Sequence, residues 1–269
     1  MVSIQTGASF AKRLFPELGP LGATSLRLIF ASMILLLYWQ SWTRKWSRPQ
    51  LLTLVGYGTS LGLMNLLFYC ALERVPLGLA VALEFTGPLG LALLASRRAL
   101  DFIWAFLAAV GVLLILPIQV SSVQKISIDG VGFALGAGIC WALYILFGKR
   151  IGEDVPSGHA TALGMGVAAI AVAPFGLLLQ GRHLFHIDLL PWALMVAILS
   201  SALPYSLEMI ALKKLPHKTF STLMSLEPAI AALSGLIFLK ENLSWVQWFA
   251  ILLVMIASAG ACLTLSSEE

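Results

Sequence analysis

Charged residues are scarce in this sequence. Asp, Glu, Lys and Arg make up only 11% of the 269 residues, hydrophobic residues make up 59%, and the mean hydropathy is +0.92. An ordinary soluble domain is about 25% charged and about 45–50% apolar. The composition therefore excludes a water-soluble fold and predicts an all-α integral membrane protein in a lipid bilayer.

Cysteine is also rare, and its placement argues against a disulfide scaffold. Cys70, Cys140 and Cys262 all fall inside apolar stretches without metal-ligand spacing. We therefore expect packing roles for them, and no metal or other cofactor. The net charge of +4 does not indicate nucleic-acid binding, because the basic residues lie in short connections between apolar stretches.

Apolar stretches of membrane-spanning length follow one another along the chain. A spanning helix needs about 20 residues. Nine such stretches lie near residues 21–39, 50–72, 76–96, 102–118, 130–148, 158–179, 190–212, 217–239 and 245–265. A shorter one, from Met1 to the residue before Pro16, reads as the second half of a first helix, and it lacks the basic leader of a cleavable signal peptide. The expected fold is a ten-transmembrane-helix bundle whose first helix is partial.

The basic residues of the connections predict the orientation. Cytoplasmic loops carry more Lys and Arg than external loops. With a cytoplasmic N-terminus, ten basic residues fall inside and six outside. The inside set is Arg44, Lys45, Arg48, Arg97, Arg98, Lys149, Arg150, Lys213, Lys214 and Lys218, and the outside set is Lys12, Arg13, Arg74, Lys125, Arg182 and Lys240. This excess favours both termini in the cytoplasm.

An internal repeat is visible when residues 60–101 are placed over residues 200–241, a shift of 140 without a gap. Two proline pairs, Pro76/Pro216 and Pro88/Pro228, and two charge pairs, Arg74/Lys214 and Asp101/Glu241, fall in register. Repeats of five helices each must enter the membrane from opposite sides. We therefore predict inverted-topology five-helix repeats at residues 1–118 and 129–265, with a substrate site near the midplane between them.

Four segments resemble the EamA-domain branch of the drug/metabolite transporter superfamily, and within it the bacterial threonine/homoserine exporters. They are VPLGLAVALEFTGP at 75–88, SRR at 96–98, LPYSLEMIAL at 203–212 and TLMSLEP at 222–228. The resemblance spans nearly the whole chain and implies a ten-helix inner-membrane protein that exports small amino acids in exchange for protons. It also implies that this chain begins inside the family's first helix, at the stretch that contains Ser3 to Lys12.

Three glutamates fall inside predicted spans, where an ionisable side chain is costly and faces a cavity or a partner by default. Glu84 and Glu227 sit near mid-span, and Glu208 lies nearer the cytoplasmic end. A carboxylate in a poorly hydrated cavity can hold either a proton or a substrate ammonium. We predict proton coupling at Glu84 first, then Glu227 and Glu208; the alternative is that they only hydrogen-bond neighbouring helices.

Prolines predict helix breaks beside these glutamates. Pro88 removes the hydrogen bond to the Glu84 carbonyl, and Pro228 and Pro204 likewise free Met224 and Ser200. Such breaks either offer backbone acceptors to a substrate or are packing kinks.

Polar and aromatic side chains at helical spacing complete the candidate substrate site. Its predicted members are Asn65, Tyr69, Glu84, Trp141, Tyr144, Tyr205 and Ser225. For any one aromatic, packing or an interfacial anchor is the alternative. The carboxylate of a substrate is expected to meet Gln5, Ser9, Lys12 or Arg27, although Arg27 can instead extend to the membrane surface.

Gly58 to Gly62 matches the G-x-S-x-G nucleophile motif. It lies within a continuous apolar stretch, however, and not on a strand-to-helix turn. We interpret this pair, and Gly132 with Gly136, as small-residue faces for close helix packing.

The leading hypothesis is a proton-coupled exporter of threonine or homoserine, not an enzyme. Export of another metabolite or an amino-acid analogue, a lipid-modifying membrane enzyme, and a channel or non-transporting membrane partner remain as alternatives. The oligomeric state stays open, a homodimer included.

Overall fold

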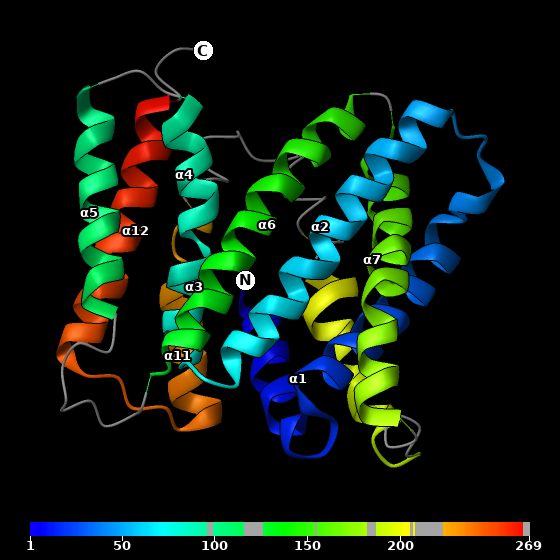
Figure 1. Ribbon diagram of the computed structural model, residues 1–269, viewed down its shortest axis with the longest axis horizontal. Helices are drawn as coiled ribbons and strands as arrows, with labels where there is room; N and C mark the ends of the chain where they lie inside the picture. The colour runs from blue at the N-terminus through cyan, green and yellow to red at the C-terminus, as the bar shows by residue number, and fades with distance from the viewer. Residues whose placement is uncertain are drawn as a thin grey trace.

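The computed structural model describes residues 1–95, 99–115, 126–153, 155–181, 187–204, 207 and 223–265. Every regular element in these ranges is a helix (Figure 1). In chain order they are α1 (Val2–Trp39), η1 (Ser41–Thr43), α2 (Arg48–Leu72), α3 (Leu77–Glu84), α4 (Thr86–Ala95), α5 (Ala99–Ile115), α6 (Ile128–Gly152), α7 (Ser157–Gln180), α8 (Leu190–Ala197), η3 (Ile198–Ala202), α11 (Glu227–Ser234), η4 (Gly235–Leu239) and α12 (Trp245–Leu265). The predicted all-helical fold is confirmed.

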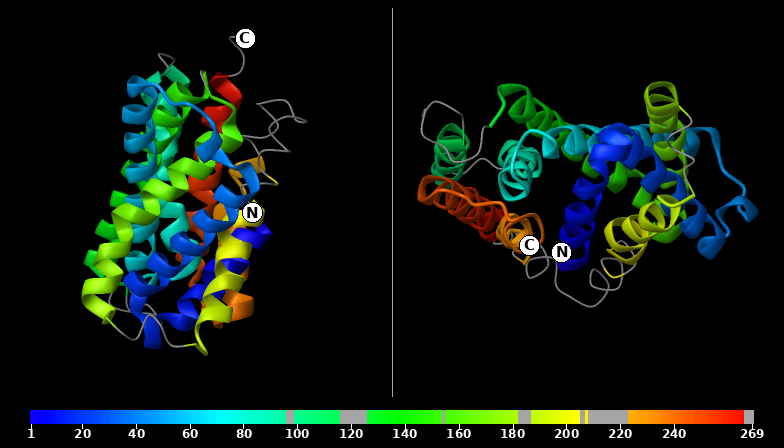
Figure 2. Two further views of the ribbon diagram at one scale, coloured as in Figure 1. Left: turned by 90° about the vertical axis from the view of Figure 1, so that its right-hand side faces the viewer. Right: turned by 90° about the horizontal axis from the view of Figure 1, so that it is seen from below.

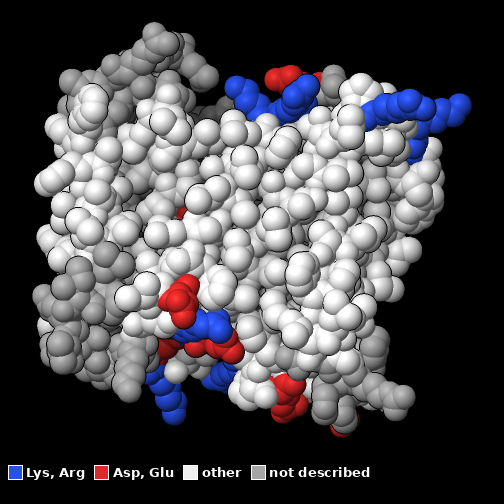
Figure 3. All heavy atoms as spheres, in the orientation of Figure 1, with Lys and Arg blue, Asp and Glu red and all other residues white. Residues whose placement is uncertain are grey.

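Five of these helices, α1, α2, α6, α7 and α12, are long and apolar enough to span a bilayer. Four shorter apolar helices each lie inside a predicted span: Leu77–Leu91, Phe102–Ile115, Leu190–Ala202 and Glu227–Leu239. On the face drawn in Figure 3, charged atoms gather along the upper edge and in the lower part, and the broad band between them is almost entirely uncharged. The protein is therefore a multi-pass membrane protein. Its orientation and its inverted repeats stay predictions.

The expected first and second helices form the single element α1, which is interrupted at Gly19. This residue has φ 60° and ψ 169°, a conformation that glycine adopts without a steric penalty. The helix runs through Pro16, and Pro20 follows the interruption, where its fixed φ suits the first turn of the next segment. The predicted stretches, one ending before Pro16 and the next beginning near residue 21, leave residues 16–20 as the connection, and the interruption at Gly19 falls within it.

The two segments of α1 diverge from this turn. The N-terminus lies at mid-height of the bundle in two perpendicular views, and α1 runs downward from it before it turns and rises again (Figures 1 and 2). The N-terminal segment contacts α11, and α1 as a whole packs against α7, α2 and α8. Residues near Met1 are thereby placed at the same depth as the middle of other helices.

Two short helices occupy the centre of the molecule. All eight residues of α3 are buried, and α3 packs against both α6 and α11. The contact with α11 is so close that a Cβ on Gly78 would lie 2.5 Å from the Ala232 Cβ. Around this pair, α5 packs with α12 on one side, and α2 packs with α6 and α7 on the other (Figure 1). The ends of α3 and α11 carry Glu84 and Glu227.

The predicted helix breaks at Pro88 and Pro228 are confirmed. The helix stops at Glu84 and restarts at Thr86, and α11 starts at Glu227 with Pro228 in its first turn. The Glu84 carbonyl lies against Gly138 of α6, where a Cβ would come within 2.6 Å of it. A neighbouring helix therefore covers this break, as the packing-kink alternative expects. Ser200, opposite Pro204, lies in the π-helical segment η3, a common adjustment where a backbone hydrogen bond is lost.

The two glycine pairs behave differently. A Cβ on Gly58 would lie 2.5 Å from the Gly164 carbonyl oxygen of α7, and one on Gly62 would lie 3.0 Å from the Ala168 oxygen. The predicted close-packing face is confirmed for this pair, because only glycine lets the two backbones approach so closely. For the second pair it is wrong. Among the described residues, Gly132 has no neighbour within 4 Å of such a Cβ, and Gly136 meets only the tip of Leu67 at 3.4 Å.

Candidate functional site

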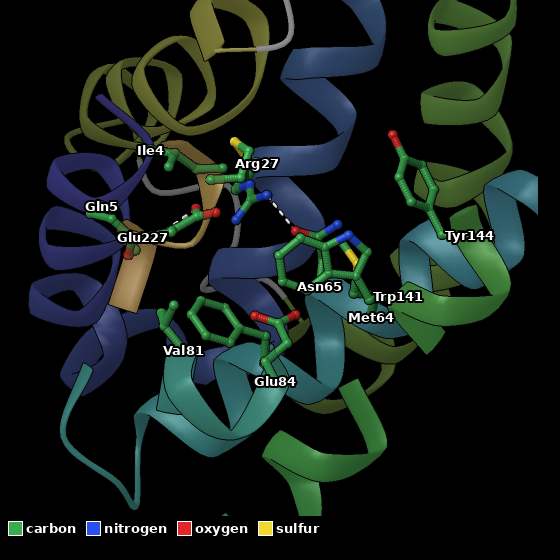
Figure 4. A pocket seen from close by; sticks show the side chains of 13 residues that line it. Ile4, Gln5, Arg27, Met64, Asn65, Val81, Glu84, Trp141, Tyr144 and Glu227 are labelled. Carbon is green, nitrogen blue, oxygen red and sulfur yellow. Dashed lines mark hydrogen bonds between the residues drawn. The ribbon is translucent and has the colours of Figure 1, made fainter. Parts of the chain in front are cut away.

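A cavity lies between the two central helices, α1, α2 and α6 (Figure 4). Its walls are mostly apolar, with a few polar groups that converge on the same space. The lining residues are Ile4, Gln5, Ala8, Arg27, Met64, Asn65, Phe68, Val81, Glu84, Trp141, Tyr144, Met224 and Glu227. A largely apolar pocket with few polar groups is the usual form of a small-molecule site.

Helical periodicity explains why these residues share one space. In the N-terminal segment of α1 the lining residues lie at positions 4, 5 and 8, and those of α2 lie at 64, 65 and 68; Arg27 comes from the second segment of α1. On α6 the contributors are three apart, at 141 and 144. Residues three and four apart lie on one face of a helix, so each helix presents one stripe to the cavity.

Glu84 closes the C-terminal end of α3. Its side chain is buried, with only 7% of the residue exposed, and it lines the cavity. Within the described part of the chain no group donates a hydrogen bond to its carboxylate. The charges of Glu227 and Arg27 both act on it. A carboxylate in this setting has vacant acceptor positions for a proton or a cation.

Glu227 faces the same cavity from the start of α11. The Nε2 of Gln5 donates a hydrogen bond of 3.0 Å to Glu227 Oε1, which links the N-terminal segment of α1 to α11. Its place in the first turn of a helix is favourable for a negative charge. Gln5 was expected to meet a substrate carboxylate, and in this structure it instead orients one of the cavity's own carboxylates.

Arg27 supplies a positive charge to the cavity. It is 3% exposed, which contradicts the alternative that it extends to the membrane surface. Its Nε donates to Ser201 Oγ at 3.0 Å, its Nη2 donates to Asn65 Oδ1, and its guanidinium lies 5.0 Å from the centroid of the Tyr69 ring. Contacts with two other elements, η3 and α2, therefore fix the orientation of this group. Asn65 is itself held by a bond from its Nδ2 to the Leu61 carbonyl at 2.7 Å.

The structure brings most of the predicted site residues together. Asn65, Glu84, Trp141, Tyr144 and Glu227 all line the cavity. The Trp141 ring meets Phe85 edge-on with centroids 5.2 Å apart, and the Tyr144 hydroxyl lies 3.2 Å from that of Tyr57. These contacts fix both rings along the α6 wall.

The other predicted members lie elsewhere. Tyr69 is fully buried behind Arg27 and is not among the lining residues. The Ser225 hydroxyl lies 3.1 Å from that of Ser258 on α12 and does not line the cavity either. Tyr205 and Glu208 lie outside the described residues.

Ser9 and Lys12, the other expected carboxylate ligands, have different partners. Ser9 donates to the Gln5 carbonyl within its own helix at 2.9 Å. Lys12 Nζ lies 2.7 Å from Glu241 Oε1 and 3.2 Å from the Val75 carbonyl oxygen, and Glu241 Oε2 accepts the Leu77 N–H at 2.8 Å. This cluster joins α1, the start of α3 and the segment after η4, away from the cavity lining.

Sequence reasoning missed the apolar walls. Ile4, Met64, Phe68 and Val81 carry no signal that separates them from the many other apolar residues of the chain. Met224 was within reach, because the predicted break before Pro228 frees its carbonyl. The arrangement as a whole can hold a small molecule that carries both a cationic and an anionic group, with its side chain against apolar surfaces.

Comparisons with known proteins agree with this description. The sequence profile of the EamA-like transporter family matches residues 128–263. The chain is 51% identical over 270 residues to the threonine/homoserine exporter RhtA of Escherichia coli K12, covering 100% of this chain and 90% of that protein. The exporter of the same name from Salmonella typhimurium LT2 is also 51% identical, over 269 residues, with the same coverage.

More distant similarities extend this picture. The uncharacterized transporter YwfM of Bacillus subtilis is 30% identical over 136 residues, 51% of this chain and 46% of that protein. A protein solved by crystallography has the same fold, with a TM-score of 0.59 at 17% identity, over all of this chain and 98% of the other. The chain is therefore a transporter and not an enzyme: it belongs to the EamA-like transporter family.

Proposed function

We propose that this protein is a secondary transporter of the bacterial inner membrane that exports small amino acids such as threonine and homoserine in exchange for protons. The observation that carries the proposal is Glu84, a buried carboxylate without a described hydrogen-bond donor in a cavity between the central helices. The 51% identity to threonine/homoserine exporters supports the substrate class.

Exchange follows if Glu84 binds one cation at a time. With the cavity open to the outside, a proton binds the carboxylate and neutralises it for the return. With the cavity open to the cytoplasm, the proton leaves and the ammonium of the amino acid takes its place. A buried carboxylate is costly when uncompensated, so the cavity changes sides readily only when one cation is bound. Each amino acid that leaves the cell is therefore matched by a proton that enters it.

The two halves of the chain supply the motion in this proposal. We take residues 1–118 and 129–265 as inverted repeats, with α3 of the first contributing Glu84 and α11 of the second contributing Glu227. Exchange of conformation between such halves exposes a central site to each side in turn. Asn65, Trp141 and Tyr144 form the wall against the substrate. Tyr205, Ser225 and Glu208 are not needed in this mechanism, and neither is a homodimer.

Efflux from proteoliposomes tests the function. Vesicles preloaded with labelled threonine or homoserine are given an inward proton gradient, and release is compared for the wild type, Glu84→Gln and Glu17→Gln. Glu17 is exposed and lies outside the cavity lining, so it serves as the matched control. We expect gradient-stimulated release in the wild type and the control, and a loss of about tenfold or more in Glu84→Gln, the scale of a lost charge-assisted hydrogen bond.

Counterflow of labelled against unlabelled threonine separates a carrier from a channel, because only a carrier accumulates label transiently. If inserted wild-type protein moves neither amino acid with or without the gradient, the substrate assignment fails, and other metabolites become the candidates.

A further inference from the structure

We propose that Arg27 binds the α-carboxylate of the substrate, so that the cavity accepts only amino acids whose α-carboxylate and α-ammonium are both free. This inference rests on the proposed function and adds to it a second recognition point and a rule for the substrate class. It concerns a residue for which sequence reasoning left two roles open, and the geometry decides between them.

Arg27 is the cation of the cavity. Among the described residues that line this space it is the only Lys or Arg, and it forms no ion pair with a described carboxylate. The carboxylates of Glu84 and Glu227 share the cavity without contacting the guanidinium directly, so a ligand carboxylate is a group that can pair with it. In Figure 4 the guanidinium points into the same space as the carboxylates of Glu84 and Glu227.

The guanidinium is fixed in place before any ligand binds. An arginine has five N–H donors, and the described contacts use the Nε–H, towards Ser201, and one Nη2–H, towards Asn65. The Tyr69 ring covers one face of the group. Donors on both terminal nitrogens remain for a ligand, and a planar carboxylate matches that fork.

The opposite charges lie on separate elements. Arg27 comes from α1, Glu84 from α3 and Glu227 from α11, so the cavity offers a cation on one wall and carboxylates on others. A zwitterionic amino acid complements both. An amide of the same amino acid leaves Arg27 without its anion, and an N-acylated form offers Glu84 no ammonium.

Competition by substrate analogues tests the rule. Wild-type protein in proteoliposomes exchanges labelled threonine, and unlabelled threonine, threonine amide and N-acetylthreonine compete. We expect each analogue to compete about tenfold or more weakly than threonine, since each lacks one charge-assisted contact. In Arg27→Gln the preference for threonine over threonine amide should collapse towards unity, while the preference over N-acetylthreonine remains. Arg27→Lys should keep part of the first preference.

Two controls separate recognition from structure. Arg150→Gln removes an exposed arginine at the end of α6 and should leave both preferences unchanged. If Arg27→Gln is too slow for exchange, thermal stabilisation of the detergent-purified variants by threonine and by threonine amide gives the same ratio without transport. A purely structural role for Arg27 would weaken both ligands equally.

Two results overturn the inference by itself: wild-type protein that accepts threonine amide as well as threonine, or a threonine-to-amide ratio that Arg27→Gln does not change. Wild-type protein that neither binds nor moves threonine contradicts the proposed function, and the inference falls with it. The two failures are therefore distinguishable.

Discussion

Glu84 and Glu241 are two buried glutamates with opposite surroundings. Glu241 accepts charge-assisted bonds from Lys12 Nζ at 2.7 Å and from the Leu77 N–H at 2.8 Å. Glu84 is equally buried, at 7% against 6% exposure, yet no described donor reaches it. The first carboxylate is fully engaged in joining α1, α3 and the segment after η4. The Glu84 carboxylate is available to bind a ligand or a proton.

The difference shows that burial alone does not assign a role to a membrane carboxylate. A buried charge is tolerated when partners compensate it. A buried charge without partners lowers the stability of the protein, so its presence indicates a functional role. We therefore expect Glu241 to contribute to the stability of the protein and Glu84 to contribute to transport. Variants that separate these two quantities test the comparison directly.

Glu84→Gln should give the largest effect on transport and almost none on stability. Threonine exchange is expected to fall about tenfold or more, because the amide cannot exchange a proton for an ammonium. The unfolding temperature should stay within about 2 °C of the wild type, or rise, since a buried charge is removed. Counterflow and thermal unfolding in detergent measure the two quantities. A large drop in unfolding temperature would place Glu84 in the same class as Glu241.

Glu241→Gln should show the reverse pattern. It removes the charge that Lys12 and the Leu77 N–H both use, at a cost of about 2 kcal/mol, discounted because the Lys12 side chain is 22% exposed. The unfolding temperature is expected to fall by about 4–8 °C. Protein that remains folded should keep gradient-dependent efflux, and its loss at full stability would contradict a structural role.

A double-mutant cycle sharpens this result. Lys12→Met leaves Glu241 with one described donor, whereas Lys12→Met combined with Glu241→Gln leaves no buried charge unpaired. The coupling energy is expected to be about 1 kcal/mol, so that the double variant is about as stable as Glu241→Gln alone. Additive losses would mean that the two side chains stabilise the protein independently of their ion pair.

Gln5→Met should have the smallest effect. It removes the hydrogen bond that orients Glu227 while keeping a similar volume. We expect threonine affinity to fall about two- to fivefold, the scale of one neutral-donor hydrogen bond. Equilibrium binding measures it, with Ser3→Ala as the control, because Ser3 donates to the Leu199 carbonyl outside the cavity lining. An effect as large as that of Glu84→Gln would make Glu227 the dominant carboxylate.

Local sequence patterns predicted the elements well. Apolar stretches of spanning length located the helices, because a bilayer requires a continuous apolar helix and little else. The depth of Glu84 and Glu227 along their stretches placed both at the cavity, and Pro88 and Pro228 located the breaks beside them.

Contacts between distant segments could not be predicted in the same way. Lys12 pairs with a residue 229 positions away, and Gln5 with one 222 away. For Arg27 the sequence left two roles open, because its burial depends on contacts with η3 and α2 that no local pattern encodes. Ser225 sits beside Glu227 in sequence but faces Ser258, since the break in the helix redirects it.

One carboxylate, Glu84, couples threonine to protons in the proposed mechanism. Lumenal pH measures this coupling in proteoliposomes loaded with threonine, without an initial pH gradient and with the membrane potential clamped. As threonine leaves, protons should enter, so we expect lumenal acidification in the wild type and none in Glu84→Gln. Threonine efflux without acidification in the wild type, or equal acidification in both proteins, would mean that Glu84 does not couple the two movements.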